Sequence, residues 1–149
     1  MTFKSHMQSA LAQARAAATR GEVPVGAVLV APDGDVLAQA GNQTRELSDP
    51  TAHAEILVIR EAALKLGTER LSGCDLYVTL EPCPMCAAAI SAARIARLYY
   101  GADDPKSGGV STGPRIFSHP QAHHVPEVYD GIAAEESRAL LQSFFAEKR

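Results

Sequence analysis

The chain has 149 residues, a length typical of one domain, so we expect a single domain spanning residues 1–149. Hydrophobic residues make up 46% of the chain and charged residues 21%, which is ordinary globular composition and excludes a disordered chain, a collagen-like repeat and a coiled coil. The net charge is −3 and the pI is about 5.9. Nucleic-acid-binding domains usually have an excess of basic residues and a pI above about 9, so the composition does not indicate such a domain.

Neither a membrane span nor a disulfide framework is expected. No apolar run reaches the ~18 residues that a membrane span needs, and the first residues do not form a signal peptide. Three cysteines are an odd number, which argues against paired disulfides and favours a reducing compartment. We therefore expect a cytoplasmic protein that does not contact a membrane.

The first half of the chain predicts a helix followed by a β-hairpin. Phe3, Met7, Leu11 and Ala14 follow one another at steps of three or four residues, which predicts an amphipathic helix over 2–20. Apolar runs on both sides of an Asp-Gly pair predict the hairpin, because Asp-Gly is a strong turn signal. The hairpin strands cover 24–31 and 36–41, and a polar loop over 42–49 follows.

The second half alternates helices with short strands. Apolar stripes predict a helix that ends at Gly67 and a final helix with one apolar face. The stripes are Ile56, Ile59, Ala63 and Leu66 in a helix over 51–66, and Leu140, Leu141, Phe144 and Phe145 in a helix over 133–148. Between them we expect strands over 75–80, 95–100 and 125–129, a helix over 83–93 and a turn-rich segment over 103–113. This order predicts an α/β sandwich around one mixed sheet, with strand 125–129 at its edge because of Pro126.

Two short motifs carry the candidate chemistry: His53-Ala54-Glu55 and Pro82-Cys83-Pro84-Met85-Cys86. Cys83 and Cys86 are three positions apart, so their sulfurs face the same way on one helical turn. Two thiolates and an imidazole suit zinc. Three protein ligands leave a fourth position open for water, whereas structural zinc sites are closed by four protein ligands.

Both motifs fall in the predicted first turns of helices. His53 and Glu55 are two positions apart and would point to nearly opposite sides of a regular helix, so they can serve one site only at a helix N-terminus. The positive end of a helix also favours thiolate at Cys83 and Cys86. A metal bound by two thiolates is a weak Lewis acid, so the site needs a base to finish deprotonating a water molecule, and we expect Glu55 to be that base.

The order H-x-E followed by P-C-x-x-C is the signature of zinc deaminases. With Asn42, the stretches DPTAHAEI (49–56), LYVTLEPCPMC (76–86) and YGADDPKSG (100–108) resemble the bacterial tRNA-specific adenosine deaminases. The resemblance runs from about Glu22 to the helix that carries Phe144 and Phe145. The metal motif is common to all cytidine-deaminase-like enzymes, whereas the stretch over 100–108 is what points to the tRNA branch.

This resemblance implies one zinc-dependent deaminase domain of cytidine-deaminase-like fold, a three-layer α/β/α sandwich around a mixed five-stranded sheet. It implies a homodimer whose sites involve both subunits. By this resemblance, His53, Cys83 and Cys86 would bind one zinc ion per chain, and Glu55 would transfer protons. The Asn42 side chain and the Ala54 backbone amide would contact the base. Asp104 and Lys106 would lie beside a flipped nucleotide.

The implied reaction is hydrolytic deamination of adenosine to inosine at the wobble position of a tRNA anticodon, with an anticodon stem-loop as the partner. Two alternatives stay open. One is a deaminase of free guanine, adenine or cytosine or of their nucleosides, which would share both motifs. The other is a non-catalytic partner subunit stabilised by zinc, in which His119, His123 or His124 could close a four-ligand site.

Several other residues have simpler interpretations. Cys74 is expected to be a small buried residue, and Gly108-Gly109 to form a flexible loop. Tyr99 and Tyr100 either pack in a strand or form a platform on which a base stacks. Arg94 and Arg97 are expected to cap a helix C-terminus or to pair with acids. The residues that could meet phosphate are Arg45, Lys106, Arg115, His123, His124, Lys148 and Arg149.

Overall fold

The computed structural model describes residues 4–147, which contain every predicted helix and strand in the predicted order. The elements are α1 (Met7–Thr19), β1 (Gly26–Val30), β2 (Val36–Gly41), α2 (Ala54–Leu66), β3 (Asp75–Leu80), α3 (Pro84–Ala93), β4 (Arg97–Ala102), the 3-10 turn η1 (Ile116–Ser118), β5 (Glu127–Tyr129) and α4 (Ala134–Glu147). Phe3, Lys148 and Arg149 lie outside the described residues.

The strands form one mixed sheet in the order β2-β1-β3-β4-β5. β1 runs antiparallel to β2 and β3, whereas β3, β4 and β5 run parallel to one another. β5 is a short edge strand, as Pro126 predicts. The mixed five-stranded sheet is therefore confirmed.

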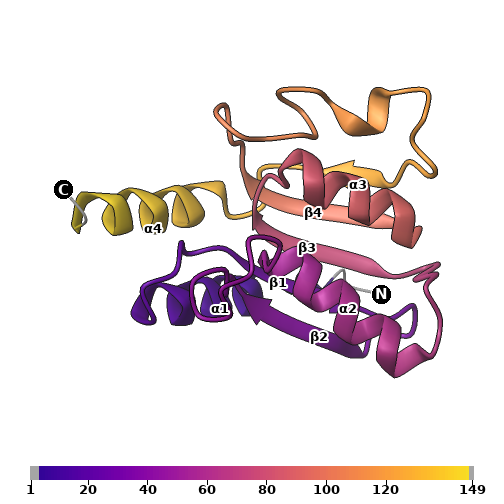
Figure 1. Ribbon diagram of the computed structural model, residues 1–149, viewed down its shortest axis with the longest axis horizontal. Helices are drawn as coiled ribbons and strands as arrows, with labels where there is room; N and C mark the ends of the chain where they lie inside the picture. Colours follow the sequence, from indigo (N-terminus) through magenta and orange to yellow (C-terminus); the bar gives the residue numbers. More distant parts are fainter. Residues whose placement is uncertain (1–3, 148–149) are drawn as a thin grey trace.

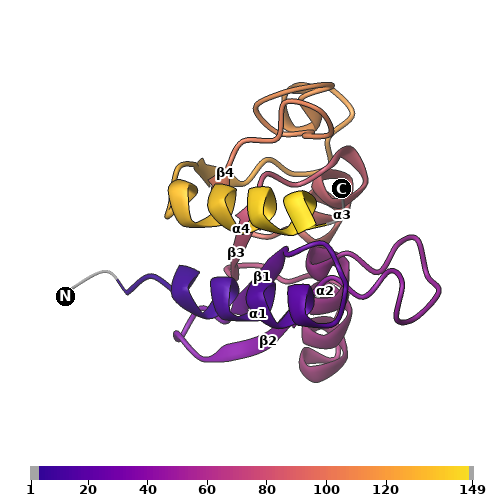
Figure 2. The same ribbon diagram turned by 90° about the vertical axis from the view of Figure 1, so that its left-hand side faces the viewer.

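Helices cover both faces of this sheet and give the three predicted layers (Figures 1 and 2). α1 and α4 lie side by side on one face, and α2 and α3 lie on the other. Strand residues alternate between two cores, as a pleated strand requires. Val28, Tyr77 and Tyr99 pack under α1, while Leu76 and Leu98 face α2 and α3.

Small residues let α1 lie directly on the backbone of the β1–β2 hairpin. Ala10, Ala14 and Ala17 are fully buried. A Cβ atom added to Gly26 would lie 1.9 Å from the Ala10 carbonyl oxygen, and one on Gly41 would lie 2.6 Å from the Gln13 carbonyl oxygen. Only glycine fits these two strand positions without displacing the helix.

The hairpin turn lies between Ala31 and Asp35 and is exposed at its tip. Gly34 adopts a φ of +96°, which favours glycine. The Gly34 N–H donates to the Ala31 carbonyl oxygen, and the Asp33 carboxylate accepts a hydrogen bond from the Asp35 N–H. These contacts explain why the Pro-Asp-Gly-Asp sequence turns the chain here.

Helix starts differ from the predicted boundaries. α1 begins at Met7 rather than at residue 2, α2 at Ala54 rather than 51, and α3 at Pro84 rather than 83. β4 begins at Arg97, two residues later than predicted, because Arg94 ends α3 in the left-handed conformation and two connecting residues follow. Arg97 pairs with Asp75 at 2.7 Å, and Cys74, Tyr99 and Tyr100 are buried, as expected.

The final helix does not present one buried apolar face. Phe144 is buried and Leu140 packs partly against the core under α1, but Phe145 is 48% exposed. The C-terminal end of α4 extends beyond the sheet (Figure 1), and the Phe145 side chain there is left exposed. The helix is anchored by Ser137, whose buried hydroxyl donates to the Thr79 carbonyl oxygen.

Across residues 4–147, every helix is too short or too polar to cross a membrane.

Candidate metal and catalytic site

Three candidate ligands meet where α2 and α3 begin. His53 and Cys83 each directly precede a helix with extended backbone, and Cys86 lies in the first turn of α3. His53 Nδ1 is 3.6 Å from Cys83 Sγ and 3.4 Å from Cys86 Sγ. Both motifs therefore occupy helix starts, as the spacing of His53 and Glu55 predicts.

The geometry of these three side chains fits a tetrahedral metal. With bonds of about 2.3 Å to sulfur and about 2.0–2.1 Å to nitrogen, two such ligand atoms lie about 3.5 Å apart. The ligand atoms all lie within 4.8 Å of one another, and within residues 4–147 they form the one cluster of His, Cys, Asp and Glu that meets this condition. This donor set suits zinc and leaves one tetrahedral position free of protein ligands.

The hydrogen bonds among these three side chains shift the pKa values of the two thiols in opposite directions. Hydrogen bonding with Cys86, and to a lesser extent with His53, lowers the pKa of Cys83 to about 4 despite its partial burial. The same contact with Cys83, together with burial, raises the pKa of Cys86. A divalent cation would displace the remaining protons and hold both sulfurs as thiolates.

Glu55 points a buried carboxyl toward this group. It is 3% exposed, and its Oε1 atom has no hydrogen-bond partner among the described residues. Burial raises the pKa of its carboxyl to about 7, although its own backbone N–H and His53 oppose part of this shift. Because an unpaired buried oxygen is costly, Oε1 is suited to receive a hydrogen bond from water or substrate.

A cavity of about 240 Å³ opens over these groups. Apolar side chains of Val23, Val25 and Leu80 form part of its wall. The polar and charged lining is Asn42, Thr44, His53, Glu55, Glu81, Cys83, Asp104 and Ser107. Its volume lies below the roughly 300–1,000 Å³ typical of drug-sized ligands, which suits one flat base.

Asn42 and Ala54 are hydrogen-bonded to each other. Asn42 Oδ1 accepts a hydrogen bond of 2.9 Å from the Ala54 N–H. The Ala54 amide is thus already engaged and fully buried, whereas Asn42 lines the cavity. With its carbonyl end held, Asn42 keeps its Nδ2 group as a donor.

Asp104 and Lys106 have different positions. Asp104 lines the cavity, but Lys106 does not. Lys106 borders an adjoining hollow of about 660 Å³ together with Asp104, Ser107 and two residues of α4, Leu141 and Phe145.

Two buried glutamates that the sequence did not mark support the loops around the cavity. Glu22 is 1% exposed and accepts hydrogen bonds from the Glu46 N–H at 2.8 Å and the Arg45 N–H at 3.2 Å. Glu81 does the same for the segment over 104–112. Burial alone would raise the pKa of the Glu81 carboxyl, but hydrogen bonds from Asp104, Val110 and Thr112 hold it below its usual range.

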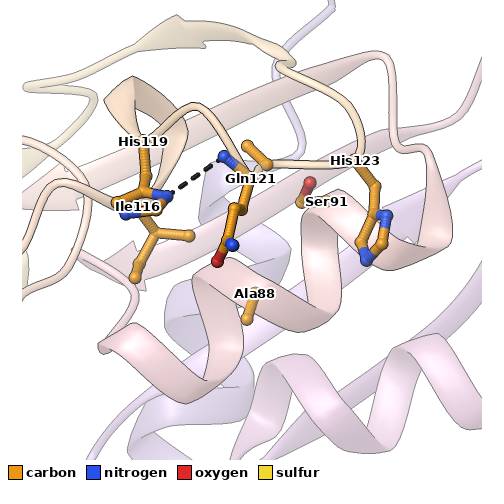
Figure 3. Close-up of a pocket in the computed structure, with 7 residues that line it drawn as sticks. Ala88, Ser91, Ile116, His119, Gln121 and His123 are labelled. Atoms are coloured by element: carbon orange, nitrogen blue, oxygen red, sulfur yellow. Dashed lines mark hydrogen bonds between the residues drawn. The ribbon is translucent and has the colours of Figure 1, made fainter.

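The three histidines near the C-terminus, His119, His123 and His124, lie outside the ligand group. Figure 3 shows His119, Gln121 and His123 around a separate cavity of about 330 Å³ beside α3, where His119 accepts a hydrogen bond from the Gln121 N–H. His124 is half-buried, with its ring 3.0 Å from the Ile95 carbonyl oxygen. None of these three histidines belongs to the metal group described above.

Gly108 and Gly109 lie in a loop, as expected, and both are buried. Among the candidate phosphate contacts, Arg45, Lys106, Arg115 and His123 are exposed, His124 is half-buried, and Lys148 and Arg149 lie outside the described residues.

Comparison with known proteins gives consistent relatives. Residues 2–102 match the family model described as the cytidine and deoxycytidylate deaminase zinc-binding region. The tRNA-specific adenosine deaminase of Agrobacterium fabrum is 63% identical over 150 residues, covering 100% of this chain and 98% of that protein. A solved structure from work on A-to-I editing by tRNA:A34 deaminases at the wobble position of transfer RNA is 62% identical, with a TM-score of 0.90, over 93% of this chain and 100% of that one.

A more distant structure carries a different specificity. Guanine deaminase from Bacillus subtilis is 31% identical with a TM-score of 0.67, covering 99% of this chain and 94% of that chain.

Proposed function

The chain belongs to the cytidine and deoxycytidylate deaminase zinc-binding family, among its tRNA-specific adenosine deaminases, and on this premise we propose that it deaminates adenosine to inosine at the wobble position of a tRNA anticodon. One observation supports the chemistry above all others. A buried carboxyl oxygen without a partner among residues 4–147, on Glu55, lies in the wall of a base-sized cavity beside the His53, Cys83 and Cys86 ligand group.

His53, Cys83 and Cys86 would hold one zinc ion per chain, because residues 4–147 contain one such group. When bound, zinc acts as a Lewis acid that lowers the pKa of a water molecule. Glu55 Oε1 would take a proton from the attacking water and deliver it to ring atom N1. As oxygen adds at C6 and the C6–N bond breaks, Glu55 would pass the second proton to the leaving amine, so that one water is consumed and one ammonia is released.

Positioning of the base would fall to the cavity walls. Val23, Val25 and Leu80 provide apolar contact for a flat ring. Asn42 Nδ2 would donate to a ring nitrogen, while the Ala54 amide would act through Asn42 by fixing its orientation. Asp104 would lie beside the nucleotide, and Lys106 would meet the backbone next to it.

The cavity can receive a base only after that base leaves its stack, which costs a few kcal/mol and least in an open loop. This favours an anticodon loop over a duplex. A tRNA substrate would place the enzyme in the cytoplasm.

The test is to incubate the zinc-loaded protein with an anticodon stem-loop that has adenosine at the wobble position, and to analyse the nucleosides by mass spectrometry. We expect inosine at that position alone. Release of ammonia from free guanine, adenine or cytosine with unmodified RNA would instead establish a free-base deaminase, the alternative favoured by the small cavity and the guanine deaminase fold. No turnover of either would leave a non-catalytic subunit.

We also propose that the chain folds as a single domain and that two copies form a homodimer. Leu64, 84% exposed on α2, and Met85, 37% exposed on α3, are apolar side chains on the helix layer nearest the site and would be covered by a second copy. Sedimentation of the wild type and of Leu64→Glu tests this, because a dimer through this layer should dissociate in the variant.

A further inference from the structure

Glu81 holds both ends of one loop segment. It follows β3 directly and is 2% exposed. Its Oε1 atom accepts a hydrogen bond from the Asp104 N–H at 2.9 Å. Its Oε2 atom accepts from three successive amides, those of Val110, Ser111 and Thr112, at 2.9–3.0 Å. One carboxylate therefore joins the first and last residues of the segment over 104–112.

The middle of the same segment lies against the start of α3. A Cβ atom on Gly108 would be 2.5 Å from Glu81 Oε2, and one on Gly109 would be 2.6 Å from the Pro84 nitrogen. The Gly109 N–H also donates to the Pro82 carbonyl oxygen at 2.8 Å. The segment can lie this close to the Cys83-containing turn only because these two residues have no side chains.

The segment contributes directly to the cavity. Asp104 and Ser107 line it, and Lys106 borders the adjoining hollow. Glu81 directly follows β3 and Cys83 directly precedes α3, so the two residues are two positions apart. A shift of the segment away from Glu81 would therefore open the cavity wall that Asp104 and Ser107 form.

We propose that Glu81 is a positioning residue, which holds the segment over 104–112 against α3 so that Asp104 and Ser107 form the wall of the base cavity. This inference rests on the proposed function for its consequence in catalysis, but the hold on the segment can be measured separately. Glu81 also lines the cavity, and the role proposed for it is to hold the segment rather than to transfer protons.

Glu81→Gln is the informative substitution. The two carboxylate oxygens both accept from N–H groups, so either orientation of a glutamine side chain places an NH2 group against backbone donors. Hydrogen bonds to a charged acceptor are stronger than those to a neutral one. The matched control is Glu69→Gln, which removes one negative charge from an exposed side chain that lines neither the cavity nor the adjoining hollow.

Amide hydrogen exchange measures the hold itself. In zinc-loaded Glu81→Gln we expect exchange at Asp104 or at Val110, Ser111 and Thr112 to be at least about tenfold faster than in the wild type and in Glu69→Gln. Zinc content should stay at the wild-type value. Unchanged exchange at all four amides, or loss of zinc, would overturn the proposal.

Kinetics with the anticodon stem-loop measure the consequence. KM should rise about tenfold in Glu81→Gln, with a smaller change in kcat, because the wall is displaced and the proton-transfer group is not. A variant that is only less stable would keep the wild-type KM at temperatures where it is folded, and that result would overturn the positioning role. If the wild type forms no inosine, the proposed function fails while the exchange result stands.

Thr112→Val covers the case in which Glu81→Gln does not fold. The Thr112 hydroxyl is 3.0 Å from Glu81 Oε2 and 2.9 Å from the Asp104 carbonyl oxygen. Its removal should speed exchange at the same amides by a smaller factor and raise KM in the same direction. Wild-type exchange and KM in Thr112→Val would contradict the proposal.

Discussion

Asn42 Oδ1 accepts a hydrogen bond of 2.9 Å from the Ala54 N–H, which joins the end of the β1–β2 hairpin to the first turn of α2. The contact satisfies one of the free amides at a helix start. It also fixes which end of the Asn42 side chain remains for a ligand.

Asn42→Asp and Asn42→Ala should therefore differ. The aspartate retains an acceptor for the Ala54 N–H but loses the donor, so we expect near-normal stability with kcat/KM about 10–100-fold lower. Alanine loses both, and the buried Ala54 amide left without a partner should cost about 1–3 kcal/mol of unfolding free energy. Thermal unfolding and stem-loop kinetics of both variants check this, and equal stability would show that the hydrogen bond is not formed.

Glu55→Gln should separate metal binding from chemistry. The variant keeps all three ligands and should retain zinc, but without a carboxylate to move protons its turnover should fall by at least about 10²–10⁴-fold. Zinc analysis by mass spectrometry and inosine formation are the measurements. A Glu55→Gln enzyme with near-normal turnover would exclude the proposed proton transfer.

Cys86→Ala, in contrast to Glu55→Gln, should lose the metal. It removes a fully buried ligand from the first turn of α3, so zinc content should fall together with unfolding temperature and activity. Cys74→Ala provides the control, because Cys74 is also buried but lies outside the ligand group. Zinc retained in Cys86→Ala, or lost in Cys74→Ala, would contradict the assignment.

Gly26→Ala tests the contact between α1 and the hairpin. Its added methyl group would lie 1.9 Å from the Ala10 carbonyl oxygen, so the helix must move and the unfolding free energy should fall by about 1–3 kcal/mol or more. Gly67→Ala is the comparison: it has open space but a φ of +68°, and should cost about 1 kcal/mol. Equal losses would indicate that α1 is not seated on Gly26.

Three tyrosines predict a loss of stability at high pH. Tyr77 and Tyr99 stack at 4.5 Å, Tyr129 stacks on Tyr99 at 5.0 Å, and burial raises the pKa of Tyr77 to about 12. Because the folded protein binds the phenol proton more tightly than the unfolded chain, this contribution is complete below about pH 10 and is lost between about pH 10 and 12.

Denaturant unfolding across that range should show a smaller alkaline loss in Tyr77→Phe than in the wild type. Burial also raises the pKa of Tyr99 and of Tyr100, so part of the loss should remain in the variant. The same alkaline loss in both proteins would contradict the prediction.

The sequence predicted the ligand group and, through the family resemblance, Asn42 and Asp104 of the cavity wall, but not the buried glutamates that hold the surrounding loops. Cys83 and Cys86 show their spacing directly, and His53 and Glu55 can cooperate only at a helix start, which the structure confirms. Glu22 and Glu81 leave no comparable signal, because their partners are backbone amides 23 or more positions away.

The starts of helices α2 and α3 could not be predicted accurately from the sequence, for a related reason. His53 and Cys83 precede their helices with extended backbone, which no apolar periodicity records. The C-terminal end of α4 was mispredicted for a different reason: an apolar stripe in the sequence does not reveal how much of the stripe contacts the sheet. Glu81 itself follows a buried strand, and that position was its one visible clue.

The turn over 31–35 has a practical use. Val25 and Asn42, at the base of the hairpin, border the cavity, so the exposed tip near Asp33 projects from the opposite end of the same two strands. A fluorescent dye or an affinity peptide attached there would travel with the rigid scaffold and leave the entrance for RNA clear.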